Sequence, residues 1–300
     1  TPAKISQLEG RLQGMRVLLV EDNEINQLVA CQLLGRAGAE VEVAENGREA
    51  VLCLKRKPTA FDAVLMDVQM PVMDGYTATR AIRQGLGLTE LPIIAMTANA
   101  MVSDRQEALD AGMNAHVSKP VEADILFQTL LETTGYQVQP LLPAAVAVTK
   151  TEFRLPDQLA GIDVAASLAR VGDARLLAQL LVRFAETQQD SIEEALQHWE
   201  AGRQEQTVQI LHRLRGAAAN LGAVHLADCV AQAESAAKAA APFPRAQECF
   251  RLRAALEEVV QSAHLIQQQL KNENASHAND EVHATFNHTE INALRALLLE

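Results

Sequence analysis

The sequence predicts a doubly wound α/β domain followed by an all-helical domain. Between Arg16 and about Gly135, short apolar runs alternate with longer stretches of helical periodicity. This is the pattern of a parallel sheet covered by helices on both faces. From about Gly161 to Leu270 every periodic stretch is helical. The segment between the two patterns contains several prolines and no helical stripe, as is typical of a linker.

Five short apolar runs are predicted strands, namely 16–20, 41–44, 62–66, 92–96 and 114–118. Helices are predicted between and after them, over 23–38, 47–56, 75–84, 103–111 and 121–134. Strands that alternate with helices in this way form a parallel sheet, here expected in the order 2-1-3-4-5.

The second half has apolar residues at the spacing of helices packed side by side. Leu176, Leu177, Leu180, Leu181 and Phe184 are one such set, and Leu252, Leu256, Val259, Val260 and Leu265 are another. This periodicity predicts an up-and-down helical bundle. The polar stretch 271–290 is expected to be disordered, and Thr289 to cap a short helix that follows it.

Composition limits the function further. The net charge of −12 argues against a nucleic-acid surface, which needs clusters of Lys and Arg. Cys31, Cys53, Cys229 and Cys249 form no CxxC pair and are expected to be small core residues in a reducing compartment. No apolar run is long enough to cross a membrane, and no secretory signal is visible. Because the chain begins at Thr1, we expect it to be part of a longer protein.

Charged and hydroxyl side chains follow four of the predicted strands at their carboxyl ends. Glu21 and Asp22 follow the first strand, Asp67 the third, Thr97 the fourth and Lys119 the fifth. In the order 2-1-3-4-5 the first and third strands are neighbours, so the three carboxylates converge. Clustered carboxylates repel one another unless a cation lies among them, and oxygen ligands favour Mg²⁺. The hydroxyl and the ammonium suit the binding of phosphoryl oxygens.

Taken singly, each of these residues is typical of a helix cap, a turn or a surface charge, and only their joint position indicates a site. Four motifs extend the pattern: LLVEDNEINQ (18–27), VLMDVQMPVMDG (64–75), AMTANA (95–100) and SKP (118–120). Through them, about residues 14–136 resemble the receiver domains of bacterial two-component systems, which have a flavodoxin-like (βα)5 fold. The resemblance implies that Asp67 is a phosphoacceptor.

Further roles follow from the same resemblance. It implies that Glu21, Asp22, Asp67 and the backbone carbonyl of Gln69 hold Mg²⁺. It implies that Thr97 and Lys119 grip the phosphoryl group, and that the Lys119–Pro120 bond is cis. The switch position of the family usually holds Tyr or Phe, whereas this chain has His116. We interpret this departure as a sign of a phosphoryl shuttle, which has less need of an output switch.

The stretch LHRLRGAAANLGA (211–223) has the sharpest local pattern of the helical half. One apolar stripe consists of Leu211, Leu214, Ala218 and Leu221. His212 lies about 140° around the helix from this stripe and is predicted to face solvent. Gly216 falls on the same face, where it costs ~1 kcal/mol relative to Ala, so we expect something to approach closely there. Arg215 flanks this face and is suited to holding a phosphoryl group.

About residues 159–270 resemble the histidine phosphotransfer (HPt) domain, a four-helix bundle with one exposed histidine, and the resemblance implies that His212 is phosphorylated. Arg215 stands where Lys is commoner, and Arg213 where kinase dimerisation helices usually carry an acid. No glycine-rich ATP-binding box is visible, so we expect no kinase core in this part of the chain. The remaining histidines, which are interpreted as surface or tail residues, are His198, His225, His264, His277, His283 and His288.

The predicted organisation is an N-terminal linker (1–14), a receiver domain (15–136), a linker (137–158), an HPt domain (159–270) and a polar tail (271–300). This order resembles the C-terminal part of tripartite hybrid sensor histidine kinases. The resemblance implies phosphoryl flow from an upstream kinase histidine through this segment to a downstream response regulator.

 

The flow implied by the resemblance runs from the kinase histidine to Asp67, then to His212, then to the aspartate of a separate receiver domain. The expected partners are therefore an upstream histidine kinase domain in the same parent chain and a downstream response regulator. No nucleic-acid partner and no direct membrane contact are expected for this segment. Its expected location is the cytosolic side of a membrane-anchored sensor.

Three other readings of the same residues stay open at this point. Asp67 is also the nucleophile expected of an aspartyl-phosphate phosphatase, although such sites usually carry a second Asp where this chain has Gln69. His212 is also suited to a phosphate sink that drains Asp67. A docking module that works without phosphorylation is the third reading, and the intact Thr97 and Lys119 count against it.

Overall fold

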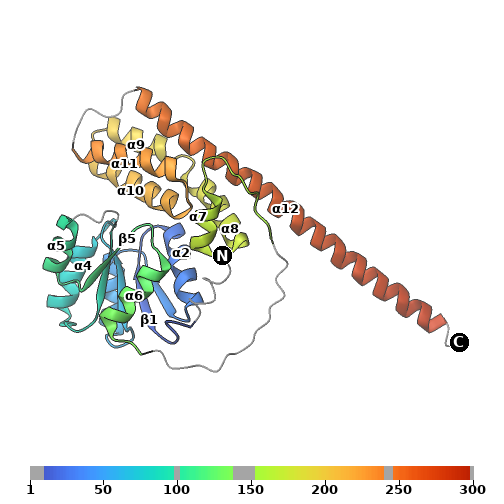
Figure 1. The fold of residues 1–300 in the computed structure, drawn as a ribbon, viewed down its shortest axis with the longest axis horizontal. Helices are drawn as coiled ribbons and strands as arrows, with labels where there is room; N and C mark the ends of the chain where they lie inside the picture. Colours follow the sequence, from blue (N-terminus) through green and yellow to red (C-terminus); the bar gives the residue numbers. More distant parts are fainter. Residues whose placement is uncertain (1–9, 98–101, 138–152, 240–245, 298–300) are drawn as a thin grey trace.

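A computed structural model of the chain describes residues 10–97, 102–137, 153–239 and 246–297. Within this part, an α/β domain lies against a helical bundle, and the last helix begins within the bundle and extends beyond it (Figure 1). Most of the two expected linkers, 1–14 and 137–158, lies outside the described residues. The two-domain organisation predicted from the sequence is present.

The α/β domain contains a five-stranded parallel sheet in the order β2-β1-β3-β4-β5. Its strands are β1 (Arg16–Val20), β2 (Glu40–Ala44), β3 (Ala63–Asp67), β4 (Ile93–Thr97) and β5 (Ala115–Ser118). Both the strand positions and the predicted order are confirmed. The neighbouring places of β1 and β3 bring their carboxyl ends together, which is the feature on which the acidic site depends.

Helices cover both faces of this sheet, so successive strand residues are buried on opposite sides. Val17 and Leu19 face α2 (Glu24–Arg36) and α6 (Ala123–Thr134). Leu18 and Val20 face the other layer, which consists of α3 (Gly47–Arg56), α4 (Gly75–Arg80) and α5 (Val102–Ala111). This two-sided burial explains why the strands appear in the sequence as continuous apolar runs.

Short polar side chains begin the helices next to the site. The Asn23 side chain accepts hydrogen bonds from the backbone N–H groups of Ile25 and Asn26, and so fixes the start of α2 directly after the acidic pair. Asp74 caps α4 in the same way through the N–H of Thr77. The predicted helix 75–84 differs in its last turn, where Ala81–Gly85 is π-helical.

The bundle contains α7 (Val164–Val171), α8 (Ala174–Gln188), α9 (Ser191–Glu200), α10 (Gln204–Asn220), α11 (Val224–Lys238) and α12 (Ala246–Leu297). Helix α10 packs between α9 and α11, and α12 packs against α8 and α11. The bundle core consists mainly of leucine, alanine, valine and isoleucine, together with the fully buried Phe184, in keeping with the low aromatic content. The prediction of a helical bundle is confirmed.

The prediction for the tail was wrong. Residues 271–290, expected to be disordered, continue α12 without a break, and no separate helix begins after Thr289. Disorder was expected because residues 271–290 have no apolar stripe that could pack against the bundle. Their backbone is helical because their local helix propensity is sufficient. No glycine or proline interrupts 246–297, and such a stretch can continue a helix that the bundle has already nucleated.

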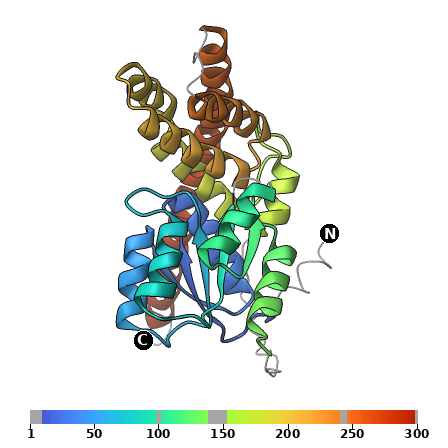
Figure 2. The same ribbon diagram turned by 90° about the vertical axis from the view of Figure 1, so that its left-hand side faces the viewer.

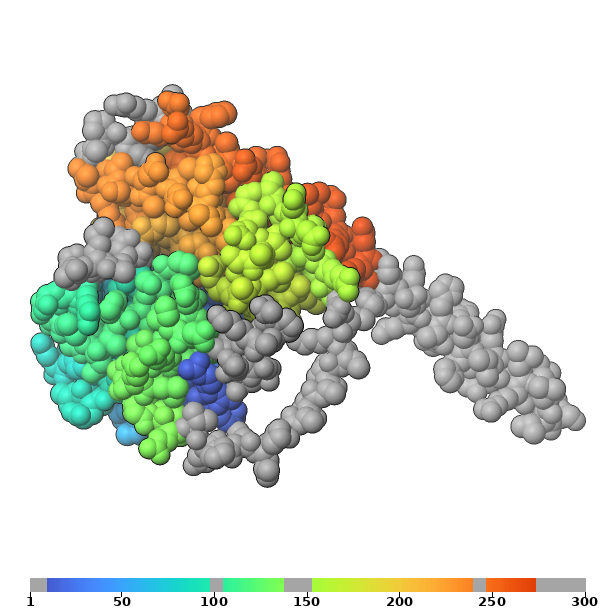
Figure 3. Space-filling model, viewed as in Figure 1, coloured from blue at the N-terminus to red at the C-terminus, as the bar shows by residue number. Residues whose placement is uncertain are grey.

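The two domains are in direct contact, which the sequence did not indicate. Helix α2 of the α/β domain contacts α7, α8 and α10 of the bundle, and the apolar core on that side of the sheet is continuous with the bundle core. Figure 2 shows the bundle above the sheet, and Figure 3 shows the surfaces of the two domains meeting. The carboxyl edge of the sheet therefore faces another part of the same chain.

Among the described residues, none of the helices combines the length and the apolar character that a membrane span requires. The four cysteines are free thiols. Cys53 is buried, as predicted for a small core residue, whereas the other three are only partly buried and pack against the core.

Candidate functional site

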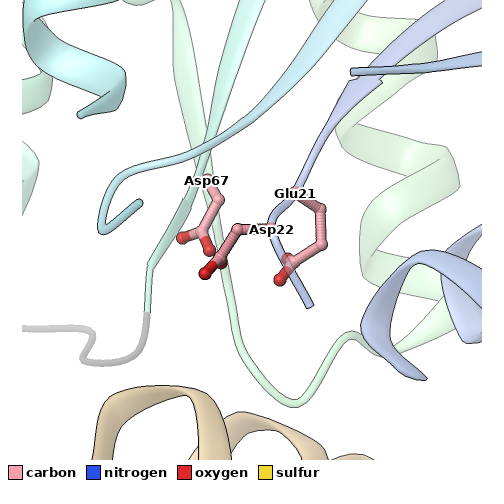
Figure 4. A group of neighbouring side chains, drawn as sticks. All are labelled: Glu21, Asp22 and Asp67. Carbon is pink, nitrogen blue, oxygen red and sulfur yellow. The ribbon is translucent and has the colours of Figure 1, made fainter. Parts of the chain in front are cut away.

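The three predicted carboxylates come together at the carboxyl edge of the sheet. Glu21 and Asp22 follow β1 directly, and Asp67 is the last residue of β3. One oxygen from each lies within 4.8 Å of the others. Figure 4 shows the three side chains pointing into the same space. Parallel pairing of two adjacent strands is sufficient to produce this cluster.

Lys119 neutralises part of the negative charge. Its Nζ lies 2.6 Å from Glu21 Oε2 and 2.7 Å from Asp67 Oδ2, and its side chain is buried. Burial alone would lower the pKa of Lys119, but the carboxylates of Asp67 and Glu21 outweigh it and raise that pKa above its ordinary value. The Lys119–Pro120 peptide bond is cis, as the resemblance implied. The ammonium is thus held charged between two acids.

Burial has the opposite effect on the carboxylates. It raises the pKa of Asp22 to about 6, with the negative charge of Glu21 as the second cause. Burial also raises the pKa of Asp67, against the attraction of Lys119. Asp22 Oδ2 is buried without a hydrogen-bond partner among the described residues. An orphaned carboxylate oxygen beside two further acids fits a hard divalent cation, which prefers oxygen ligands.

The other predicted residues of this site surround Asp67. The backbone N–H of Gln69, which lies just after β3, donates to Asp67 Oδ1 at 3.3 Å. The backbone carbonyl of Gln69 is the predicted metal ligand. Thr97 is buried at the end of β4, and its carbonyl accepts the backbone N–H of Lys119 at 2.7 Å. His116, at the switch position, pairs with Ala95 in the sheet and is half-buried. A Cβ on Gly75 would collide with the carbonyl of Asp67, which explains why the first residue of α4 is glycine.

His212 lies in the middle of α10, and the structure corrects the prediction that it faces solvent. The ring does point away from the bundle core, but it is only 7 % exposed, because the α/β domain and α11 cover it. Its Nδ1 lies 3.0 Å from Glu234 Oε1 of α11. The close approach predicted at Gly216 is present, since a Cβ there would lie 3.1 Å from Asn26 Nδ2 of the α/β domain.

Glu234 is a member of this site that the sequence reasoning missed. It is 1 % exposed, and its carboxylate pairs with Arg215 at 2.9 Å and Lys238 at 2.7 Å as well as with His212. Burial alone would raise its pKa, but the hydrogen bond and charge of His212, followed by the charge of Arg215, lower it to about 2. The signal in the sequence was an acid beside the apolar positions Val230, Ala233 and Ala237 of one helix.

The tautomer of His212 follows from this contact. An ionised carboxylate only accepts hydrogen bonds, so the ring nitrogen next to Glu234 carries the proton. The Arg215 guanidinium lies 3.5 Å from the same nitrogen, too far to replace that bond. In the neutral ring the other nitrogen, Nε2, then keeps its lone pair.

The acidic site and the histidine line the same cavity. It has a volume of about 170 Å³ and lies between the two domains. Glu21, Asp22, Asp67 and Lys119 line it from the sheet, and His212 lies among the residues that line it from the bundle. The arrangement places the carboxylate of Asp67 and the imidazole of His212 on the same cavity.

Comparison with known families agrees with this geometry. Residues 17–131 match the response regulator receiver domain, and residues 177–262 match the Hpt domain. The chain carries a receiver domain followed by an Hpt domain. Asp67 belongs to the receiver domain and His212 to the Hpt domain.

Curated relatives include sensor kinases of bacteria. The chain is 34 % identical over 251 residues to the sensor histidine kinase GacS of Pseudomonas protegens, with 81 % of this chain and 26 % of the relative covered. It is 45 % identical over 116 residues to the sensor histidine kinase RcsC of Salmonella typhimurium, with 39 % of this chain and 12 % of the relative covered. The chain thus spans about a quarter of the length of GacS.

Solved structures similar to the receiver domain include that of the sensor histidine kinase PA1611 from Pseudomonas aeruginosa PAO1, which has a magnesium ion coordinated in its active-site cleft. It is 42 % identical and covers 41 % of this chain and 99 % of its own, with a TM-score of 0.38. Another is the complex of the Saccharomyces cerevisiae phosphotransfer protein Ypd1 with the receiver domain of Ssk1. It is 30 % identical and covers 42 % of this chain and 93 % of its own, with a TM-score of 0.39.

The low pKa of Glu234 predicts a pH-dependent contribution to stability. Because the pKa is lowered on folding from 4.5 to about 2, the contribution is complete above pH 4.5 and is lost as the pH falls through 2. Glu234→Gln should therefore lower the free energy of unfolding by about 3 kcal/mol at pH 7 and by about 1 kcal/mol at pH 3, measured by urea unfolding.

Glu193→Gln is the matched control, because Glu193 pairs with Arg253 in the same bundle but is half exposed. We expect it to change the free energy of unfolding by less than about 1 kcal/mol at both pH values. An equal loss at pH 7 and pH 3 in Glu234→Gln would contradict a stabilising role of the ionised carboxylate.

Proposed function

We propose that this chain is the phosphorelay segment of a hybrid sensor histidine kinase. Asp67 accepts a phosphoryl group from a kinase histidine, His212 takes it from Asp67, and the aspartate of a separate response regulator takes it from His212. The observation that carries the proposal is the cavity shared by Asp67 and His212.

In the first transfer, a carboxylate oxygen of Asp67 attacks the phosphorus of the kinase phosphohistidine. The new P–O bond forms as the P–N bond breaks, and the kinase imidazole leaves. Lys119, already 2.7 Å from Asp67, stabilises the charge on the phosphoryl oxygens. Thr97 is the last residue of β4, at the same edge of the sheet as Asp67. Because His212 shares the cavity, the Hpt domain must move away from the receiver domain before a kinase histidine can reach Asp67.

In the second transfer, Nε2 of His212 attacks the phosphorus of the acyl phosphate. The N–P bond forms, the P–O bond breaks, and Asp67 returns to a carboxylate. No proton needs to leave, because Nδ1 keeps its proton and the phosphorylated ring gains a positive charge. Glu234 stabilises that charge through its contact with Nδ1 at 3.0 Å.

Mg²⁺ is the proposed cation of the receiver site. Glu21, Asp22, Asp67 and the carbonyl of Gln69 would hold it, which gives Asp22 Oδ2 the partner that it lacks. When bound, such an ion neutralises the phosphoryl oxygens and lowers the electrostatic barrier to the approach of a nucleophile. Lys119, which contacts Asp67, would also neutralise charge on the phosphoryl oxygens.

The relatives indicate the larger protein. Because the matched sensor kinases are much longer than this chain, we propose that a kinase domain of the same parent protein supplies the phosphoryl group. We place this segment on the cytosolic side of a membrane-anchored sensor, where a soluble response regulator can reach His212.

Magnesium should stabilise the wild-type chain. At a concentration 100 times its Kd, Mg²⁺ should add about 2.7 kcal/mol to the free energy of unfolding, seen as a higher Tm at pH 7.5. The gain should be smaller at pH 5, because protons compete for Asp22, whose pKa is about 6 without a cation.

Asp22→Asn should raise the Tm of the metal-free chain, since it removes one of three clustered charges, and should abolish most of the Mg²⁺ effect. Glu45→Gln changes the net charge equally at an exposed position after β2 and should keep the full effect. The same Mg²⁺-dependent rise in Asp22→Asn as in the wild type would contradict the proposed ligand set.

Phosphotransfer can be followed directly with a cognate ³²P-labelled kinase core. The wild type should carry acid-labile, base-stable label on His212, and His212→Gln should carry base-labile label on Asp67. Asp67→Asn should carry none. His225→Gln, which alters an exposed histidine of α11, should behave as the wild type.

Labelling of Asp67→Asn as fast as the wild type would contradict the order from Asp67 to His212. The Hpt domain would then be charged directly by the kinase, with the receiver domain as its regulator.

A further inference from the structure

The interface between the two domains has a buried pair of amides at its centre. Asn220 Nδ2 of α10 donates to Asn26 Oδ1 of α2 at 2.8 Å, and the two residues are 3 % and 6 % exposed. The bond between Arg183 and Glu24, by contrast, lies between half-exposed side chains at the edge. Arg36 adds a bond of 3.3 Å to the carbonyl of Val171.

The amide pair is the last part of a continuous chain of hydrogen bonds to Asp67. Asn26 Nδ2 donates to Glu21 Oε1 at 2.9 Å. Lys119 then joins the other oxygen of Glu21 to Asp67, with bonds of 2.6 and 2.7 Å. Four bonds thus connect the helix that carries His212 to the carboxylate that faces it. Neither Arg183 nor Arg36 takes part in this chain.

The chain has a direction that Glu21 determines. An ionised carboxylate only accepts hydrogen bonds, so Asn26 must turn its NH₂ group toward Glu21. Its carbonyl oxygen then faces the bundle, where the NH₂ group of Asn220 meets it. A ligand that holds the Glu21 carboxylate in place therefore also holds the Asn26 oxygen that accepts from Asn220 of the Hpt domain.

We propose that Asn26 couples cation binding at the acidic cluster to the docking of the Hpt domain, and that the coupling is positive. The inference rests on the cation site of the proposed function. A cation that fixes Glu21 also fixes the amide of Asn26, so less side-chain freedom is lost when the domains dock. By linkage, docking tightens cation binding by the same factor.

Simple charge attraction between the two domains predicts that a bound cation weakens docking. The bundle presents Arg213 and Arg215 to the acidic cluster across the cavity. A divalent cation in the cluster would weaken that attraction and so favour separation of the domains. The sign of the effect of Mg²⁺ on docking therefore distinguishes the two mechanisms.

The test measures the docked fraction of the full chain with and without Mg²⁺. Spin labels at Leu52→Cys on α3 and Phe250→Cys on α12, both on exposed positions away from the interface, report the distance between domains by double electron–electron resonance. The native cysteines are replaced by alanine. Arg183→Glu is included in every protein, because two acids facing each other at the edge of the interface bring the docked and undocked states into a measurable range.

In this background, Mg²⁺ should raise the docking equilibrium constant about three- to tenfold, the range that one hydrogen bond supports. Adding Asn26→Ala should abolish the rise or reverse it. Adding Arg36→Ala, the matched control, should lower docking but keep the rise, because its bond is not linked to Glu21. Calorimetric titration of Asn26→Ala in the otherwise natural chain should show weaker Mg²⁺ binding than in the wild type.

Two results would overturn the inference while leaving the proposed cation site intact. One is Mg²⁺ binding without a rise in docking, and the other is an equal rise with and without Asn26→Ala. Failure of the wild-type chain to bind Mg²⁺ in the calorimeter would overturn both the inference and the proposed cation site.

Discussion

The negative charge gathered where β1 and β3 end is the constraint on which the rest of the structure depends. Parallel strands in this order place three carboxylates within 4.8 Å of one another. Such a cluster would be costly to bury alone, and the ammonium of Lys119 compensates part of it at 2.6 and 2.7 Å from two of the acids. The remaining oxygen of Asp22 has no partner among the described residues. The site is therefore incomplete in charge and ready for a cationic ligand.

The Hpt domain also buries charged side chains, but there basic residues outnumber the acid. There, one buried carboxylate, Glu234, is surrounded by His212, Arg215 and Lys238. The hydrogen bond with His212 and the charges around the carboxylate lower the pKa of Glu234 to about 2, so the carboxylate is ionised at physiological pH. The two halves of the cavity are thus complementary, with an acid-rich wall from the receiver domain and a base-rich wall from the Hpt domain.

Sequence reasoning succeeded where a local pattern determines the structure. The apolar runs of the strands and the acids that follow them were enough to place Glu21, Asp22 and Asp67 together, because parallel topology brings strand ends to one edge. Sequence reasoning failed where a segment distant in the sequence determines the surroundings of a residue. His212 is buried by another domain, and its partner Glu234 lies on the next helix, 22 residues away. The tail 271–290 was misjudged because its polar composition hides a backbone free of helix breakers.

The covalent connection between the domains changes what their interface needs to achieve. Residues 138–152 join a receiver domain and an Hpt domain that contact each other mainly through α2 and α10. A short tether holds such partners at an effective concentration on the order of millimolar. An interface of modest intrinsic affinity then stays closed, whereas a separate receiver domain that used the same surface would have to compete without a tether. The tether would thereby favour the receiver domain of this chain over a separate one, and the proposed relay would depend on the rate at which the two domains separate.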